Sequence, residues 1–502
     1  MGKISTSLPN ASIILDRSSS SALYRQLYDQ LRAAILSGQL TAGMRLPSTR
    51  ELADELDLAR NTVMNAFDQL YSESYLERRV GDGTYVSRQL PDDLLLTKSQ
   101  HIVWEGSKGE RASLSRWGTA VASMSIAPGD YQGRPRPFRT STPALDAFPY
   151  KLWGRLLARR WSNSGKEMLP YSDSAGFPPL RKAIASYLAM VRAVRCVPEQ
   201  VIVSSGSQHA LELLAKILLN PGEVVWMEDP GFLGARAAFS AVGAQITPVP
   251  VDGEGMNVAA GIQRHPKPRL IYVTPSHQYP LGMTLSLSRR LALLKVASET
   301  GAWIIEDDYD SEFRYVGRPL AALQGLDTEQ RVIYVGTLSK VLFPSIRIGY
   351  IIAPTDLFKG FVRARSLSGV QSPTFEQAVL ADFIGEGHFA RHIRRMRALY
   401  AERQQTLVNA GRSELDGLLN IQPSDAGMHL IGWLPEGVDD RVATSAASDS
   451  GVEVTPLSAY CIEPYPRGAL RLGYTGYTPR QISQGARRLA TALGGPKRGT
   501  RF

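Results

Sequence analysis

Short apolar runs that alternate with helical patterns constrain the fold of this 502-residue chain most strongly. From Phe138 onward, such runs are separated by segments in which apolar residues recur every three or four positions. Alternation of this kind predicts an α/β domain, with helices on both faces of a mostly parallel sheet. We expect the domain to cover residues 136–495. The strand-like runs are Val201–Ser204, Val224–Met227, Leu270–Val273, Trp303–Glu306 and Arg331–Val335.

A different pattern occupies the N-terminal part of the chain. Apolar residues recur every four positions from Leu23 to Ile35, which predicts a first helix. Ser48 stands three residues before Glu51, the spacing of a capping box, so a second helix should begin there.

A third helix should follow a short break at Asp57–Ala59, and a hairpin should follow that helix. The hairpin is indicated by two β-like runs, 75–80 and 84–87, on either side of a Gly-Asp-Gly turn. Three helices and a hairpin in this order predict a winged helix-turn-helix, which we place at residues 15–88.

A winged helix-turn-helix has three places that could contact DNA. The third helix enters the major groove with its N-terminal residues, and the start of the second helix offers free N–H groups to a phosphate. The wing approaches the duplex beside them. A small helical domain with solvated charges is the alternative, but the order of the elements favours DNA binding. The residues expected to contact DNA are Ser48, Thr49, Arg50, Arg60, Asn61, Thr62, Arg78, Arg79 and Thr84.

The net charge of +10 does not itself support DNA binding, because of where the charge lies. Residues 1–88 contain 10 Lys and Arg and 10 Asp and Glu, so the whole excess lies in 89–502. Any DNA contact by the first segment must therefore come from local arrangement. Residues 89–135 are rich in Pro, Gly and scattered charge and predict a linker with a short helix in its middle.

Membrane, secretory and metal-binding classes are not indicated. No run approaches 18 uninterrupted apolar residues, so we expect no membrane span. The two cysteines, Cys196 and Cys461, form neither a disulfide framework nor a metal spacing. A reduced cytoplasm therefore fits best, with association with the bacterial nucleoid when DNA is bound.

The stretch 334–351 places one lysine, Lys340, in a turn between two apolar runs. Thr337 and Ser339 supply hydroxyls beside it, and Arg347 supplies a forked cation that suits a phosphate. Most lysines at strand ends are only surface charges. A phosphorylated aldehyde cofactor, however, needs an amine for its aldehyde and donors for its phosphate. This set favours pyridoxal 5'-phosphate.

Pyridoxal phosphate also needs an acid beside its ring nitrogen. Asp307 or Asp308, at the end of an apolar run, could supply it, and Tyr309 could donate to the ring oxygen. A metal site is the competing interpretation of these carboxylates. We expect no metal, because no histidine accompanies them at ligand spacing. The strand–glycine–helix junction at 204–208 could receive the phosphate, and Phe232 could stack on a flat ring.

The chain resembles two known families. "AGMRLPSTRELADELDLARNTVMNAFDQL" followed by "GDGTYV" resembles the GntR family of bacterial regulators. "SSGSQHAL", "EDPGF", "TPSHQYPLG", "EDDYDSEFRY", "TLSKVLFPSIRIGY" and "LRLGY" occur in the order found in fold-type I aminotransferases. The combination resembles the MocR subfamily, in which a GntR-type reader precedes an aminotransferase-like domain.

The resemblance implies roles for individual residues. Lys340 would form the Schiff base with the cofactor, Asp307 would be the ring-nitrogen acid, and Arg471 would grip the carboxylate of an effector. Tyr171 would reach the phosphate bound in the partner subunit. The other cofactor contacts would be Ser207, Gln208, Phe232, Tyr279, Tyr309, Thr337, Ser339 and Arg347.

One stretch departs from the aminotransferase pattern. Tyr279 replaces an asparagine that usually bonds the ring oxygen, and Leu281 replaces a threonine. One hydrogen bond contributes only about 0.5–1.5 kcal/mol, so cofactor binding should persist while transamination is put in doubt. His277 in the same loop could be catalytic, but a structural or pocket-lining role is favoured. The arginine-rich stretch 387–404 is interpreted as a solvated helix face rather than a DNA-binding one.

Together these features predict a PLP-dependent, DNA-binding transcriptional regulator. It would act as a head-to-tail homodimer on a double-stranded DNA operator with two half-sites. Its signal would be an amino acid or amine, such as GABA or taurine, or PLP itself. The alternative is a working PLP-dependent aminotransferase that carries a DNA-binding module, and residual transaminase activity would fit either case.

Overall fold

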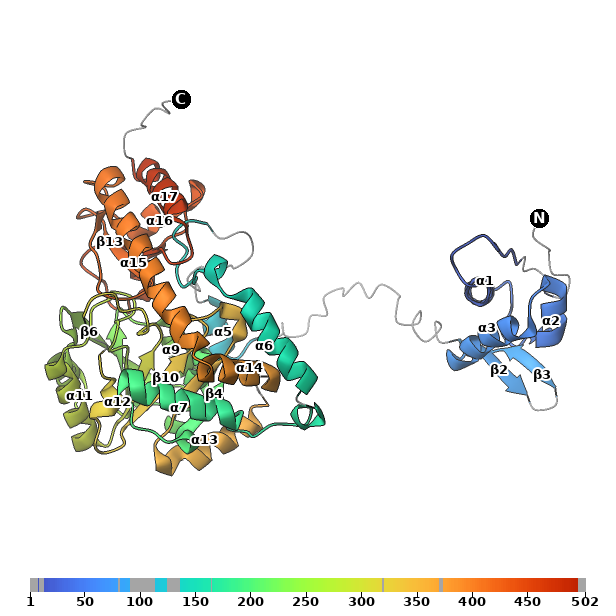
Figure 1. The fold of residues 1–502 in the computed structure, drawn as a ribbon, viewed down its shortest axis with the longest axis horizontal. Coiled ribbons are helices and arrows are strands. Elements are labelled where there is room, and N and C mark those ends of the chain that lie inside the picture. The colour runs from blue at the N-terminus through green and yellow to red at the C-terminus, as the bar shows by residue number, and fades with distance from the viewer. Residues whose placement is uncertain are drawn as a thin grey trace. The chain divides into compact units, whose positions relative to one another are not determined.

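The computed structural model describes residues 8, 13–79, 82–90, 113–123, 136–163, 165–317, 320–369 and 373–494. The chain separates into two compact units, Met1–Ser113 and Leu114–Phe502 (Figure 1). Gly81 of the expected wing turn and most of the expected linker lie outside the described residues. The short helix expected in the middle of the linker is present as α5 (Arg116–Ser123).

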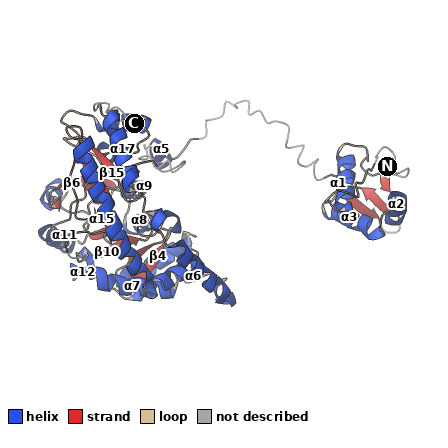
Figure 2. Cartoon of the chain, turned by 45° about the horizontal axis from the view of Figure 1, so that its top comes forward, coloured by secondary structure: helices blue, strands red, loops and turns tan. Residues whose placement is uncertain are grey.

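The first unit is a winged helix-turn-helix, and its described residues form three helices beside a small sheet (Figure 2). Leu27, Leu31 and Ile35 of the expected stripe are buried, which confirms the first helix. The antiparallel sheet has the order β1-β3-β2. The strand β1 was not expected from the sequence, because two residues are too few to show the alternation of a strand. The elements are α1 (Leu23–Leu36), β1 (Arg45–Leu46), α2 (Thr49–Leu56), α3 (Arg60–Ser72), β2 (Leu76–Arg79) and β3 (Gly83–Val86).

The helix α2 begins at the expected capping box. The Ser48 hydroxyl accepts from the Glu51 N–H at 3.2 Å, and the Glu51 carboxylate accepts from the Ser48 N–H at 2.9 Å. These two contacts with Ser48 also lower the pKa of Glu51. At the start of α3, by contrast, no side-chain cap comes from Ala59 among the described contacts. The first N–H groups of the third helix are therefore left uncapped by a side chain.

The second unit is built on a large sheet whose described strands number eight. Their order is β4-β11-β10-β9-β8-β5-β6-β7. The central pairs from β10 to β6 are parallel, whereas β4, β11 and β7 pair antiparallel. All five expected runs are strands, and the mostly parallel α/β prediction is confirmed. The strands are β4 (Val201–Ser204), β5 (Val224–Asp229), β6 (Gln245–Asp252), β7 (Gly255–Met256), β8 (Leu270–Val273), β9 (Trp303–Asp308), β10 (Val332–Thr337) and β11 (Gly349–Ile352).

Helices cover both faces of this sheet, because successive strand residues pack into different cores. Ile202 packs with apolar residues of α8, α9 and α13, whereas Val201 and Val203 pack with α7, α14 and α15. The helices of the sheet region are α6 (Tyr150–Asn163), α7 (Pro178–Arg192), α8 (Ser207–Leu218), α9 (Leu233–Ala241), α10 (Val258–Arg264), α11 (Leu287–Thr300), α12 (Leu323–Leu326), α13 (Thr355–Leu367) and α14 (Thr374–Gly385).

A smaller antiparallel sheet, which the sequence patterns did not predict, follows the long helix α15 (Figure 1). Its order is β12-β13-β15-β14. None of the helices in the described ranges has the length and apolar character needed to cross a membrane. The elements of this region are α15 (His388–Glu414), β12 (Asn420–Ile421), β13 (His429–Trp433), α16 (Asp440–Asp449), β14 (Thr455–Pro456), β15 (Ala469–Gly473) and α17 (Pro479–Ala492).

Candidate functional site

Lys340 lies just past β10, at the edge of the sheet where the parallel strands β8, β9 and β10 end. Burial, together with the neighbouring cations Arg471 and Arg347, lowers the pKa of its amine to about 8. The amine forms no hydrogen bond or ion pair with a described residue. An amine with a lowered pKa is partly neutral near neutral pH and can attack an aldehyde.

The two candidate acids of β9 point to opposite faces of the sheet and have different surroundings. Asp308 pairs with Arg192 at 3.0 Å, so its charge is compensated. Asp307 accepts a 2.7 Å hydrogen bond from the Tyr272 hydroxyl, and its other oxygen is buried with no partner among the described residues. Burial raises the pKa of Asp307 to about 7, with Asp308 and Asp310 adding to the shift. A cation bound beside Asp307 would stabilise its charged form, and a protonated pyridine ring is such a cation.

The helix start of α8 and Arg347 face each other across a glycine. Gly206 has a φ of +94°, and a Cβ there would lie 3.4 Å from the Arg347 guanidinium. Ser207 is the first residue of α8, where N–H groups and the helix dipole favour an anion. Arg347 makes no ion pair within the described ranges. The turn therefore brings a free cation to an anion-binding helix end.

Two hydroxyl-bearing residues, Thr337 and Ser339, come shortly before Lys340 in the chain. Ser339 Oγ is buried and lacks a hydrogen-bond partner in the described part of the chain. The Ser339 N–H donates to Thr337 Oγ1 at 3.3 Å. A buried hydroxyl without a partner is costly unless a ligand satisfies it, so Ser339 points to a missing acceptor.

Phe232 and Gln208 lie beside this helix start. The Gln208 side chain donates to the Gly234 carbonyl at 3.1 Å, so its amide is held by the protein. Phe232 meets Tyr279 edge to face, with ring centroids 5.3 Å apart. Tyr279 in turn meets Tyr309 at 5.5 Å, so the aromatic residues expected around the cofactor are brought together.

Arg471 is a buried cation held only by hydroxyl groups among the described residues. It donates to the hydroxyls of Tyr279, Tyr460 at 2.7 Å and Ser141 at 3.2 Å. Its guanidinium carbon lies 4.5 Å from the centroid of the Tyr279 ring. The Arg471 Nε atom has no hydrogen-bond partner in the part of the chain that the structure describes. Since burial of a charge normally requires a counter-charge, this arrangement fits an anionic ligand.

Tyr309 is positioned by a buried histidine and acid. His277 Nδ1 lies 2.8 Å from the Tyr309 hydroxyl oxygen and 3.0 Å from Asp310 Oδ2. Burial raises the pKa of Asp310. Gly427 closes the other side, where a Cβ would lie 2.0 Å from the imidazole. His277 thus contacts a residue expected to bind the cofactor, which fits its expected pocket-lining role.

Tyr171 is not part of this cluster within one chain. Its side chain is 98% exposed, in the stretch that precedes α7. A contact with a site in another subunit stays a prediction.

The residues expected to contact DNA are mostly exposed in the first unit. Arg50 and Arg60 make no ion pairs within the described residues and lie at the starts of α2 and α3. The wing arginines are engaged, because Arg78 pairs with Asp68 at 3.2 Å and Arg79 with Glu77 at 2.9 Å. Ser48 is the α2 cap, Thr62 lies in the first turn of α3, and Thr84 bonds Tyr71. Thr49 and Asn61 lie beside Arg50 and Arg60 in the same two helix starts.

Several residues of the site were missed by sequence reasoning. Tyr272 lies in an expected strand next to β9, and its alternation with Val273 placed it on the face of Asp307. Ser141 reaches Arg471 from 330 residues away in the chain, and Tyr460 from 11 residues before it, and no local pattern marks either residue. No cluster of three or more possible metal ligands occurs in the described residues, and the expectation of no metal stays a prediction.

The described residues fit pyridoxal phosphate. Asp307 offers an uncompensated acid, and Ser339 offers an unpartnered hydroxyl. Arg347 and the start of α8 offer positive charge, and Lys340 offers an amine with a lowered pKa. These groups match the ring nitrogen, the phosphate and the aldehyde of the cofactor.

A winged helix-turn-helix and an aminotransferase-like domain define a class of regulatory fusion proteins, and comparisons agree. Residues 129–489 match the family of aminotransferases of class I and II. Residues 23–86 match the gntR family of bacterial regulatory proteins. The chain belongs to the MocR subfamily of GntR-type transcriptional regulators.

Individual relatives include both regulators and enzymes. The chain is 43% identical over 482 residues to the probable rhizopine catabolism regulatory protein MocR of Rhizobium meliloti. The aligned residues cover 96% of this chain and 96% of that protein. It is 30% identical to the 2-aminoadipate transaminase of Thermus thermophilus, covering 71% of this chain and 90% of the enzyme. A crystal structure of Pyrococcus horikoshii kynurenine aminotransferase is similar, with a TM-score of 0.67 and 27% sequence identity. The match covers 76% of this chain and 95% of the enzyme.

Proposed function

We propose that this regulator binds operator DNA through residues 15–88 and senses a small amine-bearing acid in residues 136–495, with 89–135 as the linker. The buried Arg471 carries the proposal. Its described partners are neutral hydroxyls, while the Lys340 amine lies close enough for each charge to influence the other. An amino acid presents the matching pair, a carboxylate for the guanidinium and an amine for the cofactor.

Pyridoxal phosphate, when bound, supplies an aldehyde and an electron-accepting ring. Lys340 would supply the amine that holds the aldehyde, and Asp307 would hold a proton at the ring nitrogen. Ser207, Ser339, Thr337 and Arg347 would bind the phosphate, with Gln208 beside them. Tyr309, held by His277, would donate to the ring oxygen, and Phe232 and Tyr279 would contact the ring.

Binding of the effector would be linked to DNA affinity. Arg471 would bind the acid group of the effector, which would place the effector's amine beside Lys340 and the aldehyde that the cofactor would supply. By linkage, effector and DNA must then change each other's affinity by the same factor. We infer a head-to-tail homodimer, because Tyr171 is fully exposed in one chain and would meet the partner's phosphate.

An active aminotransferase is the second candidate. It is favoured by the presence of Lys340, Asp307 and Arg471 in one site and by the likeness to the 2-aminoadipate transaminase. Tyr279 argues against efficient turnover. Its hydroxyl is engaged with Arg471, at the place where the aminotransferase pattern has asparagine.

Visible absorption of the cofactor-loaded protein separates these functions. Amino acids and amines are added one at a time while the band and keto acid formation are followed. A band that shifts and persists would support a sensor and would identify the effector. A band that decays as keto acid accumulates would make the protein an enzyme. A DNA response to pyridoxal phosphate alone, unaffected by loss of Arg471, would make the cofactor itself the signal.

A further inference from the structure

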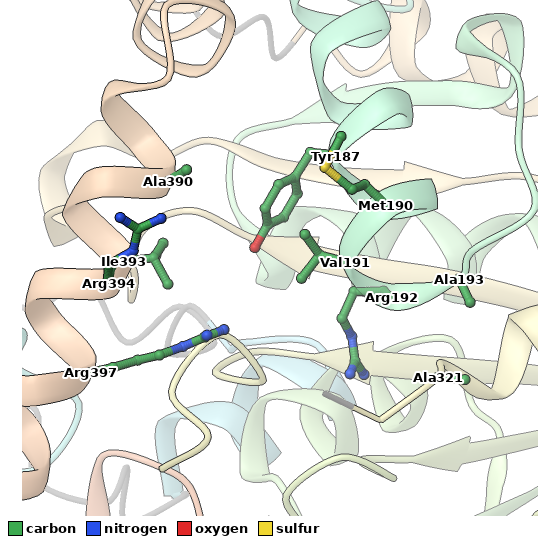
Figure 3. Close-up of a pocket in the computed structure, with 10 residues that line it drawn as sticks. All are labelled: Tyr187, Met190, Val191, Arg192, Ala193, Ala321, Ala390, Ile393, Arg394 and Arg397. Carbon is green, nitrogen blue, oxygen red and sulfur yellow. The ribbon is translucent and has the colours of Figure 1, made fainter. Parts of the chain in front are cut away.

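A cavity lies between α7 and α15, and none of its lining residues was expected to contact the cofactor (Figure 3). Its volume is about 590 Å³, within the range of small-molecule sites. We refer to it as the α7–α15 pocket. Its lining residues are Tyr187, Met190, Val191, Arg192, Ala193, Ala321, Ala390, Ile393, Arg394 and Arg397.

Positive charge gathers in this pocket from both helices. Arg394 and Arg397, three residues apart on α15, extend toward the same space as the Tyr187 hydroxyl and Arg192 of α7 (Figure 3). No carboxylate is among the lining residues. Arg394 has no ion pair within the described residues, so its five donors are open to a ligand.

The other polar groups of the pocket are fixed in place. Arg192 is buried, pairs with Asp308 and also donates to Ser276 Oγ. The Arg397 Nε donates to the Glu312 carbonyl, which leaves its terminal nitrogens for a ligand. The Tyr187 hydroxyl lies 3.3 Å from Glu312 Oε1. Two of the three guanidinium groups are thus held by the protein before any ligand arrives.

The pocket is separate from the cofactor site. It is joined to β9 through Arg192 and Asp308, whereas Asp307 points to the opposite face of the same strand. A ligand here would not compete with pyridoxal phosphate. The rest of the wall is apolar, formed by Val191, Ile393, Met190 and alanines.

We propose that the α7–α15 pocket binds a small organic anion, a carboxylate or phosphate ester with an apolar body. The guanidinium groups of Arg394 and Arg397 suit the anionic head, because their planar forks match carboxylate and phosphate oxygens. The apolar wall suits the body. Under this proposal, the arginines of the stretch 387–404 have different surroundings and different roles. Arg394 faces the pocket, Arg395 is exposed outside it, and Arg403 is buried and pairs with Asp146.

Calorimetric titration of the full-length protein, saturated with pyridoxal phosphate, tests this. The probes are phenyl phosphate, benzoate and inorganic phosphate. We expect saturable binding of phenyl phosphate and benzoate, weaker binding of inorganic phosphate, and at least a tenfold loss of phenyl phosphate affinity in Arg394→Gln. The matched control is Arg395→Gln, which makes the same change one residue away and should bind normally.

Three results would overturn the proposal. One is the absence of saturable binding for every probe at millimolar concentration. Another is an equal loss of affinity in Arg394→Gln and Arg395→Gln, which would indicate only general attraction by the positive helix. The third is a loss of operator affinity in both variants with unchanged phenyl phosphate binding. That outcome would make this face of α15 a contact for the DNA backbone.

Discussion

The two units of this protein hold their functional arginines in opposite ways. Arg50 and Arg60 of the first unit are exposed, at helix starts, and water compensates their charge. Arg471 of the second unit is buried under tyrosine hydroxyls. An exposed cation costs the fold little and can meet a partner of varied shape. A buried cation perturbs its neighbours, and Arg471 adds to the burial that lowers the pKa of Lys340.

The largest expected effect is a loss of cofactor binding in the second unit with little change in DNA binding by the first. Lys340→Ala should abolish the visible band that pyridoxal phosphate produces with the protein, because no amine remains to hold the aldehyde. Operator affinity without effector should stay within about tenfold, since the reader is a compact unit of its own. Absorption spectra and DNA titrations measure the two effects. Lys295→Ala, which removes an exposed lysine of α11, is the control. Complete loss of DNA binding would contradict the independence of the units.

The burial of charge in the second unit predicts a pH effect. The pKa of Asp307 is raised from 3.8 to about 7, so the folded protein retains a proton that the unfolded chain loses as pH rises. The contribution of Asp307 to the free energy of unfolding therefore falls between about pH 4 and pH 7. In the cofactor-free protein, Asp307→Asn should be more stable than the unmodified protein above pH 7, by up to about 4 kcal/mol.

Denaturant midpoints at pH 5 and pH 8 measure that difference. Asn can still accept the Tyr272 hydrogen bond, so the comparison isolates the charge. Asp356→Asn, at an exposed position on α13, should show no pH-dependent gain. An equal offset at both pH values would mean that Asp307 is already compensated by a neighbouring group.

Effector binding tests the buried arginine directly. Arg471→Gln should lower effector affinity by about a hundredfold, because a charge-assisted pair contributes on the order of 3 kcal/mol. Spectral titration with the identified effector measures it. Arg467→Gln changes an exposed arginine nearby and should leave the affinity unchanged. An unaltered response in Arg471→Gln would point to a signal without a carboxylate.

The smallest effect is expected at the exposed arginines. Arg60→Ala should weaken operator binding by about 1–3 kcal/mol if it contacts a base, and should leave the cofactor spectrum unchanged. Fluorescence anisotropy with labelled operator measures this. Arg25→Ala, on α1 and paired with Asp29, is the matched control. Equal losses in both variants would show that the first unit attracts DNA by charge alone.

The two units also differ in how much the sequence could predict. The winged helix-turn-helix is local, so its stripe, capping box and hairpin were all visible in short windows. Most strands of the sheet in the second unit were visible too, because buried strands are short apolar runs, but β6 and β7 were not among the expected runs. The C-terminal sheet and the partners of Arg471 were not. Ser141 lies 330 residues from Arg471 along the chain, and such contacts exist only after folding.

Position 427 shows how tightly the C-terminal region adjoins the site. The backbone at Gly427 lies so close to His277 that not even a methyl group fits between them. The Tyr315 and Tyr474 hydroxyls both bond to the Gly427 carbonyl and hold that backbone in place. The clearance is effectively zero, so the loop before β13 cannot advance toward the imidazole without displacing it. Any residue larger than glycine at position 427 would therefore have to displace the imidazole from its place beside Tyr309.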